Sequence, residues 1–218
     1  MLQLYYSPGA CSLAVHIALI EAQIPHRLQL VNTQEGEHLR AEYRAIHPLA
    51  RIPALRTPEG HVLTEVAAIL GYVDALSQRP LLPREVLLRA RAFEWMSLFG
   101  SAVHPAFVTF FRPERFTPFE DTQSLLRRDG REHFWQMLEY VEQRLPGGDS
   151  VLAEPSLVDG YASVFYLWGL RTELPMRDLK KYSRLARSVL QRPSAQLAIE
   201  REGLTPVVAP VVLGTQPS

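Results

Sequence analysis

The only cysteine of the chain, Cys11, lies where a short strand gives way to a helix. The apolar run from Leu2 to Tyr6 predicts the strand, Ser-Pro-Gly at residues 7–9 predicts a turn, and the apolar spacing from Leu13 onward predicts the helix. Free N–H groups and the positive end of the helix dipole favour an anion at such a position, so a thiolate there has a lowered pKa. We therefore expect a reactive thiol, although position alone favours a buried, inert thiol equally well.

Two segments further along offer backbone groups to a ligand. Pro53 opens a short strand and cannot donate to a sheet, so either the strand lies at an edge or a cis peptide bond exposes the N–H and C=O of Ile52. Glu65 and Val66 lie between a strand and a helix, where N–H groups can bind a carboxylate and Glu65 can bind an ammonium group. Taken alone, each segment has a simpler structural interpretation, namely an edge strand and a helix cap.

Two polar pairs lie in the second half of the chain. Ser101 and His104 are one helical turn apart, and a half-buried histidine on an amphipathic helix is the commoner interpretation of such a pair. Ser156 and Asp159 have the spacing of a capping box, with Asp in the usual Glu position. For this second pair we prefer the structural interpretation.

The elements that must position these residues divide the chain into two domains. Residues 1–77 alternate as strand, helix, strand, short helix, two strands and helix, which predicts an α/β domain. Residues 84–203 show helical spacing broken only at proline and glycine, which predicts an all-α domain. Residues 204–218 carry three prolines and a glycine, and we expect an irregular tail there.

Composition excludes several classes of protein. The 218 residues include 23 basic and 23 acidic side chains, so the chain lacks the positive excess that nucleic-acid binding needs. A single cysteine excludes an internal disulfide framework and a cysteine-based zinc site, and we expect no metal. We see no export signal at the N-terminus and no apolar run of about 20 residues that could span a membrane. A single thiol fits the reducing cytoplasm.

Taken together, these motifs resemble the cytosolic glutathione S-transferases. The resemblance covers about residues 2–203 and depends on the order and spacing of four motifs: residues 5–13 (Tyr-Tyr-Ser-Pro-Gly-Ala-Cys-Ser-Leu), residues 52–55 (Ile-Pro-Ala-Leu), residues 63–69 around Thr64-Glu65, and residues 156–159. The Pro-Gly-Ala-Cys-Ser segment and the Ser101-x-x-His104 spacing resemble the bacterial beta class in particular.

The resemblance implies a thioredoxin-like first domain, a helical-bundle second domain and a glutathione pocket between them. It places Cys11 against the glutathione sulfur, with which the beta-class cysteine can form a mixed disulfide. It also assigns roles to the other candidates: the backbone of Ile52, before a cis-Pro53, binds the cysteinyl part, Glu65 and the N–H of Val66 bind the γ-glutamyl end, and Ser101 and His104 approach the sulfur. Glutathione is then the co-substrate, a small hydrophobic electrophile is the partner substrate, and the protein is a homodimer.

Three alternatives remain open at this point. Tyr5, Tyr6 and Ser12 are rival donors to the sulfur, because other classes of the family use Tyr or Ser near this turn. A non-catalytic binding or regulatory member of the same fold is the rival to an enzyme, and Val66, which stands where many relatives have Ser, favours it. A glutathione-dependent isomerase fits less well, because that branch has a serine-rich segment where this chain has Ala-Cys-Ser-Leu at residues 10–13.

Overall fold

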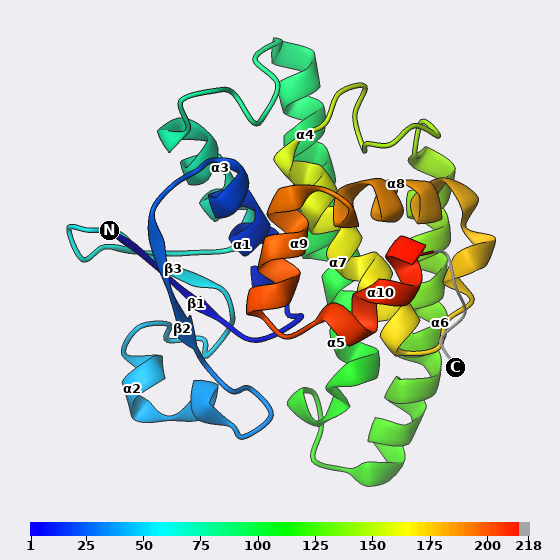
Figure 1. Cartoon of the computed structure of the whole chain (residues 1–218). Coiled ribbons are helices and arrows are strands. Elements are labelled where there is room, and N and C mark those ends of the chain that lie inside the picture. Colours follow the sequence, from blue (N-terminus) through cyan, green and yellow to red (C-terminus); the bar gives the residue numbers. More distant parts are fainter. Residues whose placement is uncertain (214–218) are drawn as a thin grey trace.

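The computed structural model describes residues 1–213, which form a four-stranded sheet with its helices and a larger set of helices beside it (Figure 1). The elements of the first part are β1 (Leu2–Tyr6), α1 (Ser12–Glu21), β2 (His26–Leu30), η1 (Glu37–Leu39), α2 (Ala41–Arg44), β3 (Ala54–Arg56), β4 (Val62–Thr64) and α3 (Val66–Leu76). Those of the second part are α4 (Val86–Leu98), η2 (Phe99–Val103), α5 (His104–Phe111), η3 (Pro113–Arg115), α6 (Glu120–Arg144), α7 (Leu157–Arg171), η4 (Met176–Asp178), α8 (Lys180–Leu190), α9 (Pro193–Arg201) and α10 (Thr205–Leu213).

The sheet has the strand order β2-β1-β3-β4, with β1 parallel to β2 and antiparallel to β3, and β3 antiparallel to β4. Leu4 of β1 pairs with Leu55 of β3, and both side chains are fully buried in the core. The strand and helix order predicted from the sequence is confirmed, as is the thioredoxin-like fold class with a helical second part.

Helix α1 lies between the sheet part and the helical part and packs against both. Eight of its ten residues are buried, because the helix packs on the sheet through β1 and on α7 and α9 of the helical part (Figure 1). A helix that is apolar on every side is expected to be buried in this way. The two parts therefore share one core, and the turn that precedes α1 lies where they meet.

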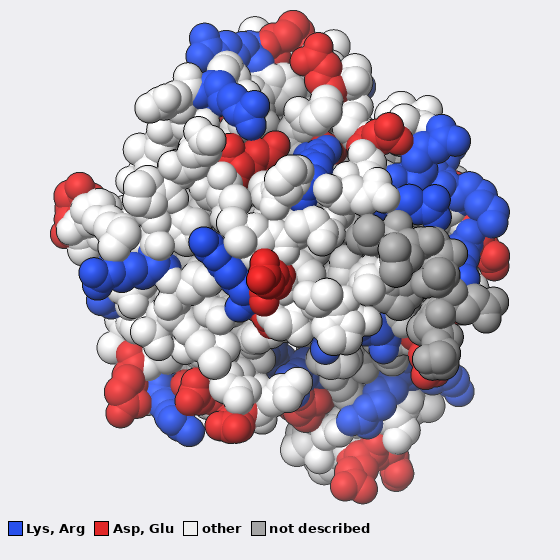
Figure 2. Space-filling model, in the orientation of Figure 1, with Lys and Arg blue, Asp and Glu red and all other residues white. Residues whose placement is uncertain are grey.

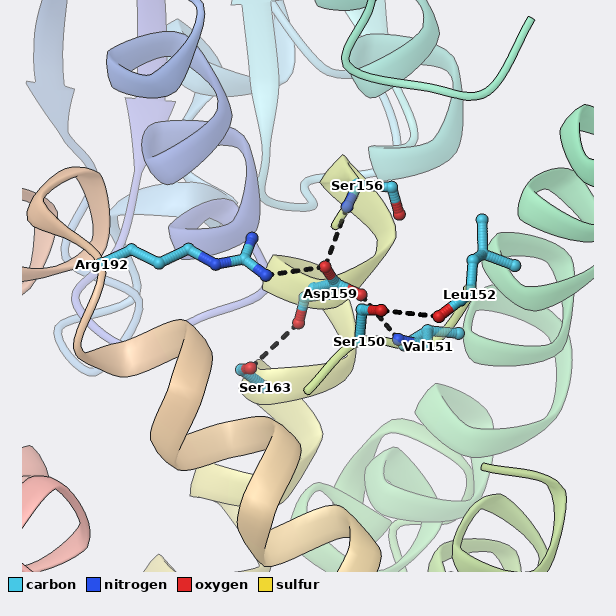
Figure 3. Close-up of polar contacts among 7 residues, drawn as sticks. All are labelled: Ser150, Val151, Leu152, Ser156, Asp159, Ser163 and Arg192. Atoms are coloured by element: carbon cyan, nitrogen blue, oxygen red, sulfur yellow. Dashed lines mark hydrogen bonds and ion pairs between the residues drawn. The ribbon is translucent and has the colours of Figure 1, made fainter. Parts of the chain in front are cut away.

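The predicted capping pair, Ser156 with Asp159, begins α7, and Figure 3 shows the half of the box that Asp159 makes. The fully buried Asp159 carboxylate accepts hydrogen bonds from the backbone N–H groups of Ser156 at 2.9 Å and Val151 at 2.8 Å. It also pairs with the Arg192 guanidinium at 2.8 Å, immediately before α9. A buried carboxylate is tolerated only with such partners, and here they tie the start of α7 to the preceding loop and to α9.

The prediction of an irregular tail over residues 204–218 is wrong for its first part, because residues 205–213 form helix α10. Val208 in the helix and Leu204 just before it are both buried in the core. This apolar contact stabilises helix α10. Pro206 is the second residue of the helix, where a missing N–H costs nothing. Residues 214–218 of the predicted tail lie outside the described residues.

Across residues 1–213, no helix combines the length and the apolar composition needed to cross a membrane.

Candidate active site

A cavity of about 740 Å³ opens between the sheet part and the helical part. Six of the seven site residues predicted from the sequence line it: Cys11, Ile52, Pro53, Glu65, Val66 and His104. The loop before α1, the start of β3 and the start of α3 supply one wall, and α5 and α7 supply the other.

The Cys11 thiol lies at the N-terminal end of α1 and is almost fully buried. Its Sγ donates a hydrogen bond to the backbone carbonyl of Ile52 at 3.2 Å. Burial raises the pKa of Cys11 to about 12, and the Glu65 carboxylate acts in the same direction, whereas the N–H groups at the helix start act against it. The expectation of a lowered pKa is wrong, because the cost of desolvating a thiolate exceeds what the helix terminus returns. The thiol is protonated at neutral pH.

The backbone at the two candidate ligand-binding segments departs from regular geometry, and the cis peptide bond that the resemblance implies is present. The peptide bond between Ile52 and Pro53 is cis. Glu65 caps α3 with φ = 67° and ψ = 123°, a conformation that few residues other than glycine adopt. Its side chain is exposed at the cavity wall, and Val66, the first residue of the helix, is buried beside it. The first N–H groups of α3 have no partner within the helix and are available to an anion.

His104 begins α5 directly after the π-helical turn η2. Such turns occur frequently at functional sites, and no signal in the sequence distinguished this one from continuous helix. The imidazole packs edge-on against Trp168, with ring centroids 5.1 Å apart. Burial lowers the pKa of His104 to about 4, and the Arg51 and Arg115 guanidinium groups act in the same direction. The ring is therefore neutral at pH 7.

Ser101 is separated from the other predicted residues. Its side chain is exposed and its hydroxyl donates to the Ser97 carbonyl at 2.7 Å, one turn earlier in the helix. It does not line the cavity.

The rival donors also lie away from the cavity wall. Tyr5 is buried on the opposite side of β1, edge-on to Tyr43 with centroids 5.9 Å apart. Tyr6 packs against His16, with centroids 6.3 Å apart. Ser12 is fully buried, and its hydroxyl both donates to the Ser7 carbonyl at 3.2 Å and accepts from the Ser7 N–H at 3.3 Å. The Ser12 hydroxyl therefore closes the loop before α1.

Tyr161 was not predicted from the sequence. This residue of α7 is almost fully buried and lines the cavity, and its hydroxyl has no hydrogen-bond partner among residues 1–213. Burial, followed by the nearby Cys11 and Glu65, raises the pKa of Tyr161 well above its ordinary value, so the phenol remains a hydrogen-bond donor. The residue lies within an apolar helix pattern, and its orientation depends on how α7 packs.

Charge along the cavity wall is uneven. Within the described chain, Glu65 is the one carboxylate among the lining residues. Four arginines contribute to the same lining: Arg51, Arg112, Arg115 and Arg171. The sequence gives no indication of this gathering, because the four residues come from distant segments and the whole chain is neutral. On the outer face shown in Figure 2, by contrast, basic and acidic side chains are interspersed.

In the part of the chain that the structure describes, no three His, Cys, Asp or Glu side chains lie close enough together to hold a metal ion.

Comparisons with known proteins agree with this architecture. Residues 9–76 match the glutathione S-transferase N-terminal domain. The solved structure of a glutathione transferase homolog from Sulfitobacter, with bound glutathione, is 28% identical and has a TM-score of 0.88, covering 94% of this chain and 99% of that chain. A bacterial beta class glutathione S-transferase from Sphingomonas chungbukensis is 30% identical with a TM-score of 0.78, over 93% of this chain and 99% of that chain.

Among the curated relatives, some match about half of the chain and others match nearly all of it. A probable maleylacetoacetate isomerase from Drosophila melanogaster is 35% identical, but only over 46% of this chain and 45% of its own. The glutathione S-transferase GstA of Escherichia coli O157:H7 is 30% identical over 207 residues, which are 93% of this chain and all of that protein. This chain belongs to the glutathione S-transferase family.

Proposed function

We propose that this transferase binds glutathione along the sheet wall of the cavity and conjugates its thiol to a small hydrophobic electrophile held against α5 and α7. The observation that carries the proposal is the meeting of three complementary groups on one wall: the free N–H groups at the start of α3, the Glu65 carboxylate and the Ile52 backbone before cis-Pro53. Glutathione offers the matching carboxylate, ammonium and peptide groups.

The electrophile would lie against an aromatic wall. Phe107 stacks on Trp168 with ring centroids 4.2 Å apart, and Phe111 stacks on Phe107 at 4.9 Å. All three rings line the cavity. Flat apolar surfaces of this kind suit a planar hydrophobic substrate.

Conjugation requires the glutathione thiol as a thiolate, which neutral donors can stabilise by hydrogen bonding. The Tyr161 hydroxyl and the neutral His104 imidazole supply two such donors at the cavity, and the Cys11 S–H becomes a third when a bound sulfur replaces the Ile52 carbonyl as its acceptor. The glutathione thiol releases its proton to solvent, the thiolate sulfur attacks the electrophilic carbon, the new C–S bond forms, and the leaving group departs with its electron pair. We do not extend the proposal to thiol–disulfide exchange through Cys11, because exchange needs a thiolate and burial keeps this thiol protonated.

We also propose a homodimer, formed through α3 and α4, that works in the cytoplasm. Large apolar side chains are exposed on these two helices, with Leu76 46%, Val86 83% and Leu87 61% accessible. Such exposure is typical of an interface. Light scattering at micromolar concentration should give a dimer mass, and a monomer would contradict this part of the proposal.

Calorimetric titration with glutathione tests the proposed site. Glu65→Gln replaces a charge-assisted hydrogen bond to the γ-glutamyl ammonium with a neutral one, which costs about 1–2 kcal/mol, or roughly 5–30-fold in affinity. Glu59→Gln is the matched control, because Glu59 belongs to the same domain but does not line the cavity. A wild-type protein that binds glutathione but conjugates no electrophile would support the non-catalytic alternative. Equal dissociation constants for Glu65→Gln and the wild type would show that glutathione binds elsewhere.

A further inference from the structure

The cavity contains more positive charge than glutathione can neutralise. Arg51, Arg112, Arg115 and Arg171 face one carboxylate, Glu65. Glutathione with an ionised thiol carries a net charge of about −2 at neutral pH, since its ammonium offsets one of two carboxylates. Counted over the lining side chains alone, one positive charge is left in a filled glutathione site, and the Glu114 carboxylate, which is not part of the lining, lies 3.7 Å from Arg112.

Two of the arginines belong to the electrophile side of the cavity. Arg112 and Arg115 follow α5 directly, the helix that carries Phe107 and Phe111 of the aromatic wall. The Arg112 guanidinium lies over the Phe111 ring, 5.3 Å from its centroid. A planar substrate stacked on this wall would thus bring an edge substituent toward these guanidinium groups.

These two side chains lack strong partners of their own. Arg112 reaches the Glu114 carboxylate only at 3.7 Å, and Arg115 forms no ion pair with any residue in the described part of the chain. The positive charges also act on one another: burial, then Arg112, lowers the pKa of Arg115, and the same two arginines contribute to the lowered pKa of His38 across the cavity. Weakly paired cations that repel one another at a cavity wall favour the binding of an anion there.

We infer that the electrophilic substrate is an anion, a flat apolar or aromatic molecule bearing a carboxylate, and that Arg112 and Arg115 bind this carboxylate while the aromatic wall binds the ring. The inference depends on the proposed transferase function and specifies its second substrate. The arginines orient the ring so that its electrophilic carbon faces the glutathione sulfur. Substitution then forms the C–S bond, breaks the bond to the leaving group, and releases that group with its electron pair.

A matched pair of substrates tests the inference: a chloro-dinitrobenzoate and the corresponding chloro-dinitrobenzamide, which have the same shape but differ in charge. In both, the thiolate displaces chloride from the ring. After division by the uncatalysed rates, kcat/KM should favour the benzoate by about tenfold, the smaller end of what a hydrogen bond to a charged group contributes. The preference should fall with added salt, because the guanidinium groups are partly exposed.

Arg115→Gln and Arg112→Gln should each reduce this preference, and the double variant should abolish it. Arg128→Gln is the matched control, because Arg128 is exposed on α6, pairs with Asp129 at 2.7 Å and does not line the cavity; it should leave the preference unchanged. The dissociation constant for glutathione, measured in the same variants, shows whether the arginines bind the carboxylate of the electrophile or the glycyl carboxylate of glutathione.

Three outcomes would overturn the inference. Equal turnover of benzoate and benzamide would show that the substrate charge is not bound, while the transferase function stands. An unchanged preference with weaker glutathione binding in Arg115→Gln would assign these arginines to the glycyl carboxylate of glutathione. Failure to bind glutathione and to conjugate either compound would overturn the proposed function itself.

Discussion

The carboxylate of Glu202 accepts a hydrogen bond from the backbone N–H of Gly9 at 3.0 Å, joining residues at opposite ends of the chain. Its other oxygen lies 2.9 Å from Nδ1 of His16 in α1, and both side chains are fully buried. The carbonyl of Gly9 in turn accepts a hydrogen bond from the Trp168 indole N–H at 2.8 Å. The loop that carries Cys11 is therefore fixed on both sides by the helical part of the molecule.

The backbone conformation and the close packing at position 9 both favour glycine. Its φ is +67°, and a Cβ there would lie 2.9 Å from the Arg171 guanidinium and 3.4 Å from Leu204. The loop before α1 consequently depends on α7 and on the end of α9 for its conformation.

Removing the Glu202 carboxylate should loosen this loop. Glu202→Ala leaves the Gly9 N–H and the His16 ring without a partner in buried surroundings, at a cost of about 2–6 kcal/mol in the free energy of unfolding. Glu202→Gln keeps an acceptor for Gly9 and should cost less. Denaturant unfolding measures the stability, and hydrogen exchange at residues 9–11 measures the loop.

Glu200→Ala is the control for this prediction, because Glu200 is exposed on α9, two residues before Glu202. The free energy of unfolding and the exchange rates of Glu200→Ala should equal those of the wild type. Unchanged exchange at residues 9–11 in Glu202→Ala would show that Trp168 alone is sufficient to hold the loop.

The Cys11 thiol should react slowly in the native protein. With a pKa of about 12, only a small fraction is thiolate at neutral pH, so alkylation should be at least about a hundredfold slower than that of free cysteine. Unfolding in guanidinium should restore the ordinary rate, and Cys11→Ala should not be labelled. The measurement is the rate of alkylation as a function of pH, followed by intact mass. Labelling faster than free cysteine would restore the nucleophilic assignment.

The sequence was sufficient to predict most of the elements, because strand alternation, helical spacing and turn residues are local signals, and the order and spacing of its motifs predicted the family. It also placed Cys11, Glu65 and His104 at one site, through the resemblance of their motifs. The protonation states of these residues could not be predicted from the sequence, since the pKa of Cys11 depends on its burial by residues from other elements. The same holds for Tyr161, whose role depends on the packing of α7, and for helix α10, whose apolar contacts outweigh its prolines.

His104 should make the folded protein sensitive to acid. Its pKa is about 4 when folded and 6.5 as the ordinary value, so the unfolded chain takes up a proton first as the pH falls. The stability that neutral His104 contributes is complete above about pH 6.5 and is lost between about pH 6.5 and pH 4, with a ceiling of about 3 kcal/mol. His104→Gln should lose less stability over this window, as measured by denaturant unfolding at several pH values.

Other histidines share this behaviour and define the control. The pKa values of His26, His38 and His47 are also lowered by burial, so both proteins lose stability in acid through these residues. The difference between wild type and His104→Gln isolates one group. Parallel stability curves for the two proteins would show that the His104 pKa is not lowered.

Val66 gives the sharpest test of how glutathione lies in the cavity. Its backbone N–H at the start of α3 can bind the γ-glutamyl carboxylate, but its side chain offers no donor. Val66→Ser adds a hydroxyl, and a hydrogen bond to a charged acceptor contributes about 1.5–3 kcal/mol, less what water already supplied. We expect glutathione binding to become tighter by roughly threefold to thirtyfold.

The structure adds a cost and a matched control to this prediction. Val66 is 95% buried in the core, so replacing it should lower the free energy of unfolding by about 1–3 kcal/mol. Val66→Ala loses the same packing but gains no hydroxyl, so it should bind glutathione about as the wild type does. Calorimetry on the three proteins separates the two effects. If Val66→Ser binds no more tightly than Val66→Ala, the γ-glutamyl group does not lie at this helix start. If only Val66→Ser binds glutathione, Val66 marks a member of the family that has left glutathione chemistry, and the non-catalytic alternative holds.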